Sequence, residues 1–409
     1  MLHIVKPLLR RPLMPLLIVL QVALACAIAC NALFLLQQKL GPILAPSGVG
    51  NPTDLIFLTN IIPRGTPWPA ARLKGVQAEL SAVPGVTEAS YAASLPMTST
   101  AKLAGDVYGA DVHSKIHAMA YLGNDLIRTL GLRLVAGRDF TPEEAGVTLG
   151  SDIGFHTTGP VIVTRALADR LYPDGHALGR SIGYSDSPGG ERIIVGIVAH
   201  LLRNQFGQDN SDLDYTMLLP GVPNHWPVPT FAVRVNAADA LRVCKPLVAV
   251  IQRNIGADLF GGNPVDCNTF AEARDKMLAP QRAAVWLLSG VTLIVLIVTL
   301  TGIMGMTGYW VQQRTRSIGI RRALGARRSD VLRELLIENL LVVGIGVIAG
   351  LIAAYGINLW LMQHYELLRL PWIYLPVGAV LLLALGQLAV LMPARRASRI
   401  SPMLATRAI

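Results

Sequence analysis

Four stretches of the chain are apolar over the length that a membrane-spanning helix needs. A hydrocarbon layer about 30 Å thick requires about 20 apolar residues in a helix. The four runs cover residues 13–36, 284–308, 335–361 and 374–392, and they carry little internal charge. This pattern predicts an α-helical membrane protein with four transmembrane helices.

The first run could instead be a cleaved signal peptide. Lys6, Arg10 and Arg11 precede it, and Ala25 and Ala27 offer a cleavage site. The apolar core of a signal peptide spans about 7 to 15 residues, whereas this run continues to residue 36. We therefore expect an uncleaved transmembrane helix.

Residues 37–282 have a different pattern, in which short β-branched and apolar runs alternate with helical ones. This alternation predicts a mixed α/β domain, with the Pro-rich stretch 220–229 dividing two lobes. The expected strands are 55–60, 86–92, 106–110, 117–122, 161–164, 192–199, 216–219, 231–235 and 265–270. The expected helices are 70–83, 125–130, 165–172 and 237–254, followed by a stalk helix near 271–283. We expect turns at residues 84–85, 187–190 and 261–262, and a helix capped by Thr141.

The distribution of charge predicts the orientation of the chain. Its 36 Lys and Arg against 26 Asp and Glu give a net charge of +10, which could indicate nucleic-acid binding or membrane topology. The segment 314–333 holds seven arginines against one acid, Asp330, and both termini are basic. The positive-inside rule then places residues 1–12, 309–334 and 393–409 in the cytoplasm, and 37–282 and 362–373 outside. We expect no nucleic-acid partner.

Small residues recur at four-residue intervals within the spans. They are Gly346, Gly350 and Ala354 in the third span and Thr301 and Gly305 in the second. This spacing lets helix backbones approach closely, either within one subunit or between subunits. Because Glu338 lies near a span end, the spans lack the midplane acid that an ion-coupled carrier needs.

The external domain carries no recognisable catalytic motif. We find no G-x-S-x-G elbow, no H-E-x-x-H helix and no Walker A loop in the chain. Its scattered histidines form no ligand pattern, and we expect no metal site; they are His113, His117, His156, His176 and His200. Cys244, on an expected helix, and Cys267, on the expected strand beside it, either form a disulfide or remain two buried thiols.

The arginine-rich segment between the second and third spans also carries an apolar ridge. If it is helical from about Thr315, then Ile320, Ala323 and Leu324 share one face. Gly325 suits the left-handed end of such a helix. On charge alone, the segment could simply anchor the loop or bind anionic lipid.

The order of residues in this segment resembles a family signature. Residues 314–326 read Arg-Thr-Arg-Ser-Ile-Gly-Ile-Arg-Arg-Ala-Leu-Gly-Ala, which is similar to the R-x-x-E-I-G-I-x-R-A-L-G-A signature of FtsX/MacB-type ABC permeases. Residues 393–402 are similar to the family's P-A-x-x-A-A-x-x-x-P ending. Residues 83–86, 129–132, 137–140, 178–180 and 194–198 resemble its periplasmic core pattern.

The resemblance covers nearly the whole chain and implies a coupling helix that contacts an ATPase. The residues it assigns to that helix are Arg316, Ser317, Ile318, Gly319, Ile320, Arg322, Ala323, Leu324, Gly325 and Ala326. Ser317 stands where the family usually has Glu, so a carboxylate that could pair with an ATPase base is missing. Partner choice or coupling strength can differ for that reason.

The resemblance further implies the permease subunit of an ABC transporter in the bacterial inner membrane. ATP and Mg would bind a separate cytoplasmic ATPase, and this chain would bind no cofactor and catalyse no reaction. The implied partners are a second permease copy or paralogue and a periplasmic adaptor, and the implied use is export or efflux by mechanotransmission. A lipoprotein-releasing permease of the LolC/LolE kind and an FtsX-like regulator of cell-wall hydrolases are alternatives.

Overall fold

The computed structural model describes residues 13–99, 102–109, 115–150, 158–184, 187–206, 210–236, 240, 242–262, 264–325, 327–365 and 370–398. The chain divides into two compact units. One, the external domain, runs from Gly41 to Pro280, and the other, the membrane unit, comprises the residues up to Leu40 and from Gln281 onward. The division lies a few residues from the predicted limits of 37 and 282.

Four long helices carry the apolar runs: α2 (Leu13–Leu44), α8 (Phe270–Ala323), α9 (Arg328–Tyr365) and α10 (Tyr374–Ser398). Within the described residues, these four are long and apolar enough to cross a membrane. Each one continues beyond the span predicted from hydropathy at one or both ends, because polar residues at the flanks remain helical. In α8 the predicted stalk, the span and the coupling residues up to Ala323 belong to one helix.

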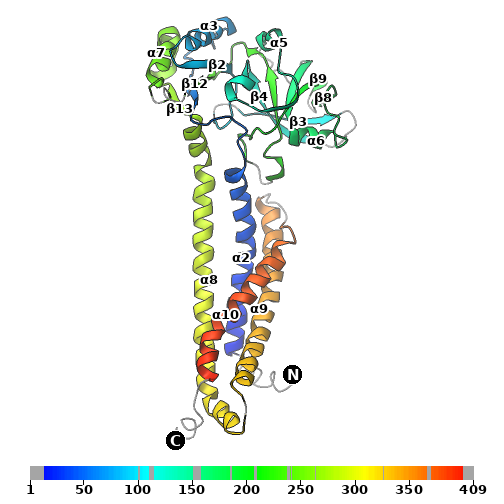
Figure 1. Ribbon diagram of the computed structural model, residues 1–409, viewed down its shortest axis with the longest axis vertical. Coiled ribbons are helices and arrows are strands. Elements are labelled where there is room, and N and C mark those ends of the chain that lie inside the picture. Colours follow the sequence, from blue (N-terminus) through cyan, green and yellow to red (C-terminus); the bar gives the residue numbers. More distant parts are fainter. Residues whose placement is uncertain are drawn as a thin grey trace. The chain divides into compact units, whose positions relative to one another are not determined.

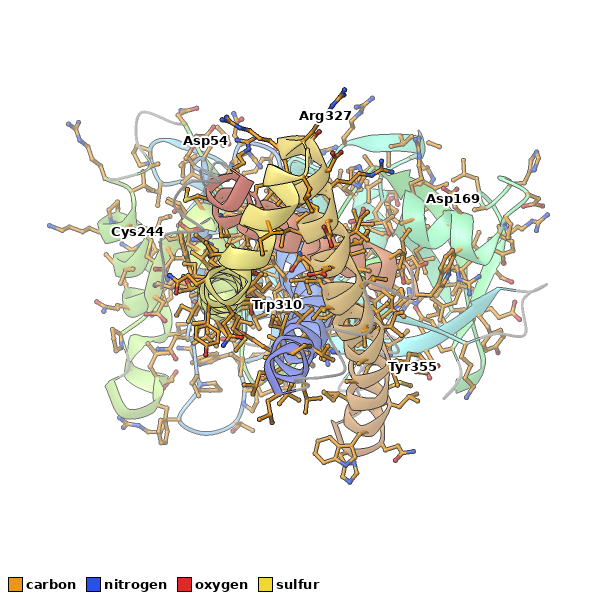
Figure 2. All side chains as sticks on the ribbon, turned by 90° about the horizontal axis from the view of Figure 1, so that it is seen from below. Asp54, Asp169, Cys244, Trp310, Arg327 and Tyr355 are labelled. Atoms are coloured by element: carbon orange, nitrogen blue, oxygen red, sulfur yellow. A yellow bond between two sulfur atoms is a disulfide. The ribbon has the colours of Figure 1, made fainter. Side chains whose placement is uncertain are left out.

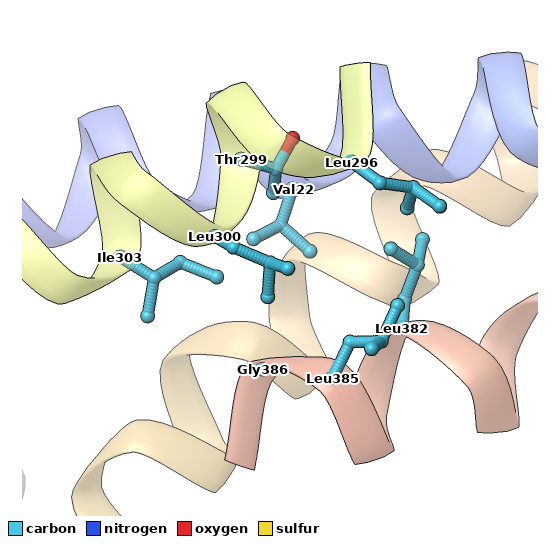
Figure 3. Close-up of a pocket in the computed structure, with 8 residues that line it drawn as sticks. All are labelled: Val22, Leu296, Thr299, Leu300, Ile303, Leu382, Leu385 and Gly386. Atoms are coloured by element: carbon cyan, nitrogen blue, oxygen red, sulfur yellow. The ribbon is translucent and has the colours of Figure 1, made fainter. Parts of the chain in front are cut away.

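The membrane unit packs around α2, which contacts α8 and α9 through polar side chains. Gln21 of α2 donates a hydrogen bond to the carbonyl of Val298 in α8 (3.0 Å), and Asn31 donates to that of Ala354 in α9 (3.3 Å). Figure 3 shows the mostly apolar residues of α2, α8 and α10 that surround a cavity of about 10 Å³. A cavity of this size holds about one water at most. This cavity is therefore a small packing gap.

One of the two predicted small-residue faces packs within the chain. A Cβ on Gly346 would lie 2.8 Å from Cβ of Val22, and one on Gly350 would lie 2.5 Å from Cβ of Cys26. Ala354, one turn further along α9, is fully buried. The predicted pair Thr301 and Gly305 is exposed, so of the two alternatives only a contact with another subunit stays a prediction for them. Within this chain, it is Gly302 of α8 that lies against Gln21 of α2.

The described strands of the external domain form one large sheet in the order β10-β7-β9-β8-β3-β4-β2-β12-β1-β13, with β5 paired to β9. A small second sheet pairs β11 with β6. The strands are β1 (Leu55–Thr59), β2 (Val86–Ala92), β3 (Leu103–Gly109), β4 (Ile116–Gly123), β5 (Leu134–Gly137), β6 (Thr148–Leu149), β7 (Gly159–Thr164), β8 (Ser181–Tyr184), β9 (Ser187–Val198), β10 (Thr216–Pro220), β11 (Val222–Pro223), β12 (Thr230–Val235) and β13 (Asp266–Thr269). The helices are α3 (Ala70–Ser81), α4 (Leu126–Leu130), α5 (Pro142–Gly146), α6 (Arg165–Leu171) and α7 (Cys244–Ile255).

Two hydrophobic clusters give the external domain its two lobes. In the first, α3 and α7 pack on β1, β2 and β12, and Figure 1 shows these two helices together at one end of the sheet. In the second, α6 packs on strands that include β3, β4, β7 and β9. A third cluster contains Phe57 of the first lobe together with Tyr121 and Leu218 of the second. The lobes therefore share one sheet and one set of core side chains.

Several predicted boundaries in this domain were wrong. The helix expected at 237–254 begins at Cys244, because Pro246 is tolerated only in the first turn of a helix. The turn expected at 187–190 is the start of β9, which pairs with β8 through Ser187 and Tyr184. The short strands β5, β6, β8 and β11 were missed, because runs of two to four residues carry little periodicity.

Candidate coupling segment and stalk junction

The predicted coupling residues from Arg316 to Ala323 form the final part of α8, and Leu324 and Gly325 follow in a turn. Figure 1 and Figure 2 show that beyond Trp310 the helix leaves its earlier direction and runs sideways before it ends at Ala323. The sequence predicts a short amphipathic helix from about Thr315; in the structure this stretch is helical but continues α8, which begins at Phe270. Ser317 and Gly319 lie in this stretch, and such residues are a common cause of helix bends.

The apolar ridge of this segment is uncovered. The Leu324 residue is 83% exposed and Ile320 is 49% exposed, although both are large and apolar. The amide of Leu324 still donates to the carbonyl of Ile320 (3.0 Å), so the two side chains lie one helical turn apart on one face. Of the other predicted coupling residues, Gly319 is buried, and Ala326 lies outside the described residues. The side chains of Arg316, Ser317, Ile318, Arg322 and Ala323 are also outside the description.

A tight connection follows the ridge. Gly325 has φ +102°, the left-handed conformation that the sequence predicts for the end of this helix. The carboxylate of Asp330 accepts a hydrogen bond from the amide of Arg327 (3.0 Å), which caps the start of α9. The exposed residues Ile320 and Leu324 therefore lie immediately before a short, capped connection between α8 and α9.

The other end of α8 is built into the external domain. Thr269, the last residue of β13, and Glu272 form a reciprocal capping box, with hydrogen bonds of 2.9 and 3.2 Å. Phe270 is fully buried, and its ring meets that of Phe57 in β1 edge-to-face at 5.7 Å. The helix α8 therefore continues directly from an edge strand and a core aromatic residue.

Arg274 joins this end of α8 to the end of α2. Its Nη2 donates hydrogen bonds to the carbonyls of Ile43 (3.2 Å) and Ala45 (2.8 Å). These carbonyls belong to the C-terminal turn of α2, where a cation also interacts favourably with the helix dipole. We call the set of Thr269, Phe270, Glu272 and Arg274 the stalk junction.

The linker after α2 is fixed to the same domain. The amide of Leu202 donates to the carbonyl of Ser47 (3.2 Å), and that of Gly50 donates to the carbonyl of Leu130 (3.0 Å). Gly48 has φ +80°, and a Cβ there would lie 1.9 Å from the carbonyl oxygen of His200. Only glycine fits this position, so the linker is a close-fitting connection.

Sequence reasoning missed the stalk junction, although one signal was present. Thr269 and Glu272 have the T-x-x-E spacing of a capping box before an apolar run. Arg274 gave no comparable signal, because its partners are backbone carbonyls more than 200 residues away.

Cys244 and Cys267 are joined by a disulfide, with Cα atoms 5.8 Å apart. The bond ties the first turn of α7 to β13, the strand that leads into α8. Cys26 and Cys30 are free and buried in α2.

Within the described residues, no three His, Cys, Asp or Glu side chains lie close enough together to hold a metal ion. His117 pairs with Asp106 and His200 with Asp214, each as a single contact. His176 hydrogen-bonds the carbonyl of Asp174. The remaining predicted candidates, His113 and His156, lie outside the described residues.

Comparison with known proteins connects these features to one family. Residues 289–402, which include both the coupling segment and the basic C-terminal motif, match the family model for the FtsX-like permease C-terminal domain. The chain is 28% identical over 289 residues to the macrolide export ATP-binding/permease protein MacB of Chromobacterium violaceum. Residues 289–402 therefore form an FtsX-like permease C-terminal domain, and the chain is similar to ABC transporter permeases.

The alignment covers 69% of this permease and 42% of that MacB protein, so the chain matches less than half of the length of this relative. The uncharacterized ABC transporter permease YvrN of Bacillus subtilis is 27% identical over 294 residues, which are 69% of this permease and 68% of YvrN. The solved periplasmic region of MacB from Actinobacillus actinomycetemcomitans is 12% identical, with 56% of this permease and 94% of that chain covered and a TM-score of 0.35.

Proposed function

We propose that this permease couples ATP hydrolysis on a separate cytoplasmic ATPase subunit to movement of its external domain, for export or efflux by mechanotransmission. The observation that carries the proposal is the uncovered pair Ile320 and Leu324 at the end of α8. Two large apolar side chains on one helical face, surrounded in sequence by arginines, are suited to a groove on a soluble partner. ATP and Mg would bind that partner.

The orientation that this function needs has both termini and the coupling segment in the cytoplasm of a bacterial inner-membrane protein. The seven arginines of 314–333 support it through the positive-inside rule. The disulfide of the external domain also supports it, because such bonds persist in oxidising compartments outside the cytoplasm.

The stalk junction supports transmission of force rather than passage of substrate between the helices. A displacement of α8 acts directly on β13 through Thr269 and on β1 through Phe270, and Arg274 carries it to the end of α2. The 10 Å³ cavity among α2, α8 and α10 is lined almost entirely by aliphatic side chains and offers no polar route. We further propose that two permeases, identical or paralogous, act with two ATPase subunits and a periplasmic adaptor.

The substitution Leu324→Asp tests the contact with the ATPase. If Leu324 occupies a groove, a buried and unpaired carboxylate costs about 3 kcal/mol or more, which is a loss of roughly a hundredfold in affinity. Membrane insertion should not change, because acids contribute little to topology. The measurements are co-purification of the ATPase and permease-dependent ATP turnover, with expression level as the reference.

Arg327→Ala is the matched control, because it changes an exposed charge three residues away and leaves the ridge intact. We expect this variant to retain the ATPase. If both variants keep the ATPase and its turnover near the wild-type level, the segment only anchors the loop and the proposal is wrong.

A further inference from the structure

A groove of about 290 Å³ runs along the first half of α9. Its wall on this helix follows one face at three- and four-residue spacing: Ser329, Leu332, Arg333, Leu336, Ile337 and Leu340. The polar residues Ser329 and Arg333 lie at the end nearest the start of α9, and the leucines and Ile337 continue into the span. The groove therefore has one charged end and one apolar end.

The charge at that end has no ion-pair partner among the described residues. Within the described part of the chain, the guanidinium of Arg333 makes no ion pair. The nearby carboxylate of Asp330 instead accepts a hydrogen bond from the amide of Arg327. Both Ser329 and Arg333 are exposed. An arginine in this setting matches a phosphate, which can accept two parallel hydrogen bonds from the guanidinium.

Aromatic residues place this charged end at the level of lipid headgroups. Trp286 and Tyr309 of α8 are 23 residues apart, about 35 Å along a helix, which is the spacing of the two interfaces of a bilayer. Trp310, next to Tyr309, lines the same small cavity as Glu338 of α9. Arg333 lies five residues before Glu338, about 7.5 Å further from the membrane centre. The groove thus extends from the headgroup region into the hydrocarbon.

A polar group on α10 also lies in the groove wall. Gln387 lines the groove, and its buried Nε2 has no hydrogen-bond acceptor within the described residues. An unsatisfied amide in hydrocarbon is unfavourable. The ester carbonyls of a phospholipid lie just below its phosphate, so they are acceptors that a lipid in this groove would supply.

We propose that this groove binds one anionic phospholipid of the inner leaflet. The phosphate pairs with Arg333 beside Ser329, an ester carbonyl accepts from Gln387, and an acyl chain lies along Leu332, Leu336 and Leu340. The inner-leaflet assignment rests on the proposed orientation of the chain. The charge at Arg333 favours an anionic lipid over a zwitterionic one, and over a second copy of this chain, whose apolar surface would leave the guanidinium unpaired.

Lipid retention by the purified full chain tests the proposal without the ATPase, so its outcome is independent of the proposed coupling. Native mass spectrometry in detergent, after addition of phosphatidylglycerol or phosphatidylcholine with identical acyl chains, should show one tightly retained phosphatidylglycerol. Arg333→Gln should weaken that retention about fivefold, the contribution of one basic residue near an anionic surface. Leu336→Trp, which keeps the charge and fills the groove, should also reduce it.

Arg327→Gln is the matched control, because it removes an exposed positive charge from the same region without lining the groove. We expect it to bind lipid as the wild type does. Equal retention of the two lipids, or equal losses for Arg327→Gln and Arg333→Gln, would overturn the proposal in favour of non-specific attraction. Efficient disulfide crosslinking between two chains carrying Leu336→Cys would also overturn it, because a second copy would then occupy the groove.

Discussion

Glu144 holds one turn of the external domain together through both of its carboxylate oxygens. Arg138 donates to each oxygen at 2.8 Å, and the amide of Thr141 donates to one of them at 2.8 Å. In return, the hydroxyl of Thr141 accepts the amide of Glu144, which completes a capping box at the start of α5. The sequence predicts Thr141 as the cap of this helix, and the structure confirms it.

These contacts give a prediction about pH. The hydrogen bonds from Arg138, followed by those from Thr141, hold the pKa of Glu144 below its ordinary value. A lowered folded pKa means that the stabilisation is complete above the ordinary value near 4.3 and is lost as pH falls through the lower folded value. We expect Glu144→Gln to lower the free energy of unfolding by about 0.5 kcal/mol at pH 7, because the ion pair is partly exposed.

The measurement is the thermal midpoint of the full chain in detergent at pH 7 and at decreasing pH. The difference between wild type and Glu144→Gln should shrink below about pH 4.3. Glu143→Gln is the control, because Glu143 is the exposed neighbour on the same turn. A difference that stays constant down to pH 3 would contradict the assigned role.

At the scale of elements, the contact between α9 and α2 depends on glycine. A Cβ at Gly350 would lie 2.5 Å from Cβ of Cys26 and 2.6 Å from the carbonyl oxygen of Ala23. The Cβ of Cys26 and the carbonyl of Ala23 are fixed to the backbone of α2. Neither atom can therefore rotate away as the end of a flexible side chain would. The two helices must separate to admit a single methyl group.

We therefore expect Gly350→Ala to destabilise the membrane unit by about 1–3 kcal/mol, the usual cost of overpacking. Gly344→Ala is a matched control on the same helix, because a Cβ there meets nothing within 4 Å. Alanine is also the better helix former, so the control should be neutral or slightly stabilising. The thermal midpoint in one detergent separates the two, and equal midpoints would show that the backbones are not in close contact at Gly350.

The elements differ in how well the sequence predicts them. Apolar runs of 19 residues or more identify all four spans, because the bilayer selects for length and composition together. Strand β2 was predicted with its exact bounds, and most other strands within a few residues. The start of α7 was predictable in principle from Pro246. Thr301 and Gly305 show what the sequence cannot predict. Small residues at four-residue spacing indicate a close contact between helices, but they do not identify which helix is the partner.

At the scale of the whole molecule, two connections join the membrane unit to the external domain, and both enter it at the stalk junction or beside it. Helix α8 enters through the cap at Thr269, and α2 enters through the linker of Ser47 and Gly50. Arg274 is the side chain that ties these two entries together. If force passes through both helices, this residue keeps their movements synchronous.

This role predicts a separation of ATP turnover from external movement. Arg274→Ala should leave the ATPase bound and active, because the substitution lies far along the chain from Ile320 and Leu324. The ATP-dependent change in amide hydrogen exchange, measured with vanadate-trapped complex, should then become smaller in the linker 45–50 while it persists at the start of α8. Lys276→Ala is the control, because Lys276 is an exposed cation two residues further along α8 and, among the described residues, hydrogen-bonds Asn268 of its own domain. If Arg274→Ala shows the wild-type exchange pattern in the linker, α2 and α8 transmit force independently and the junction is only structural.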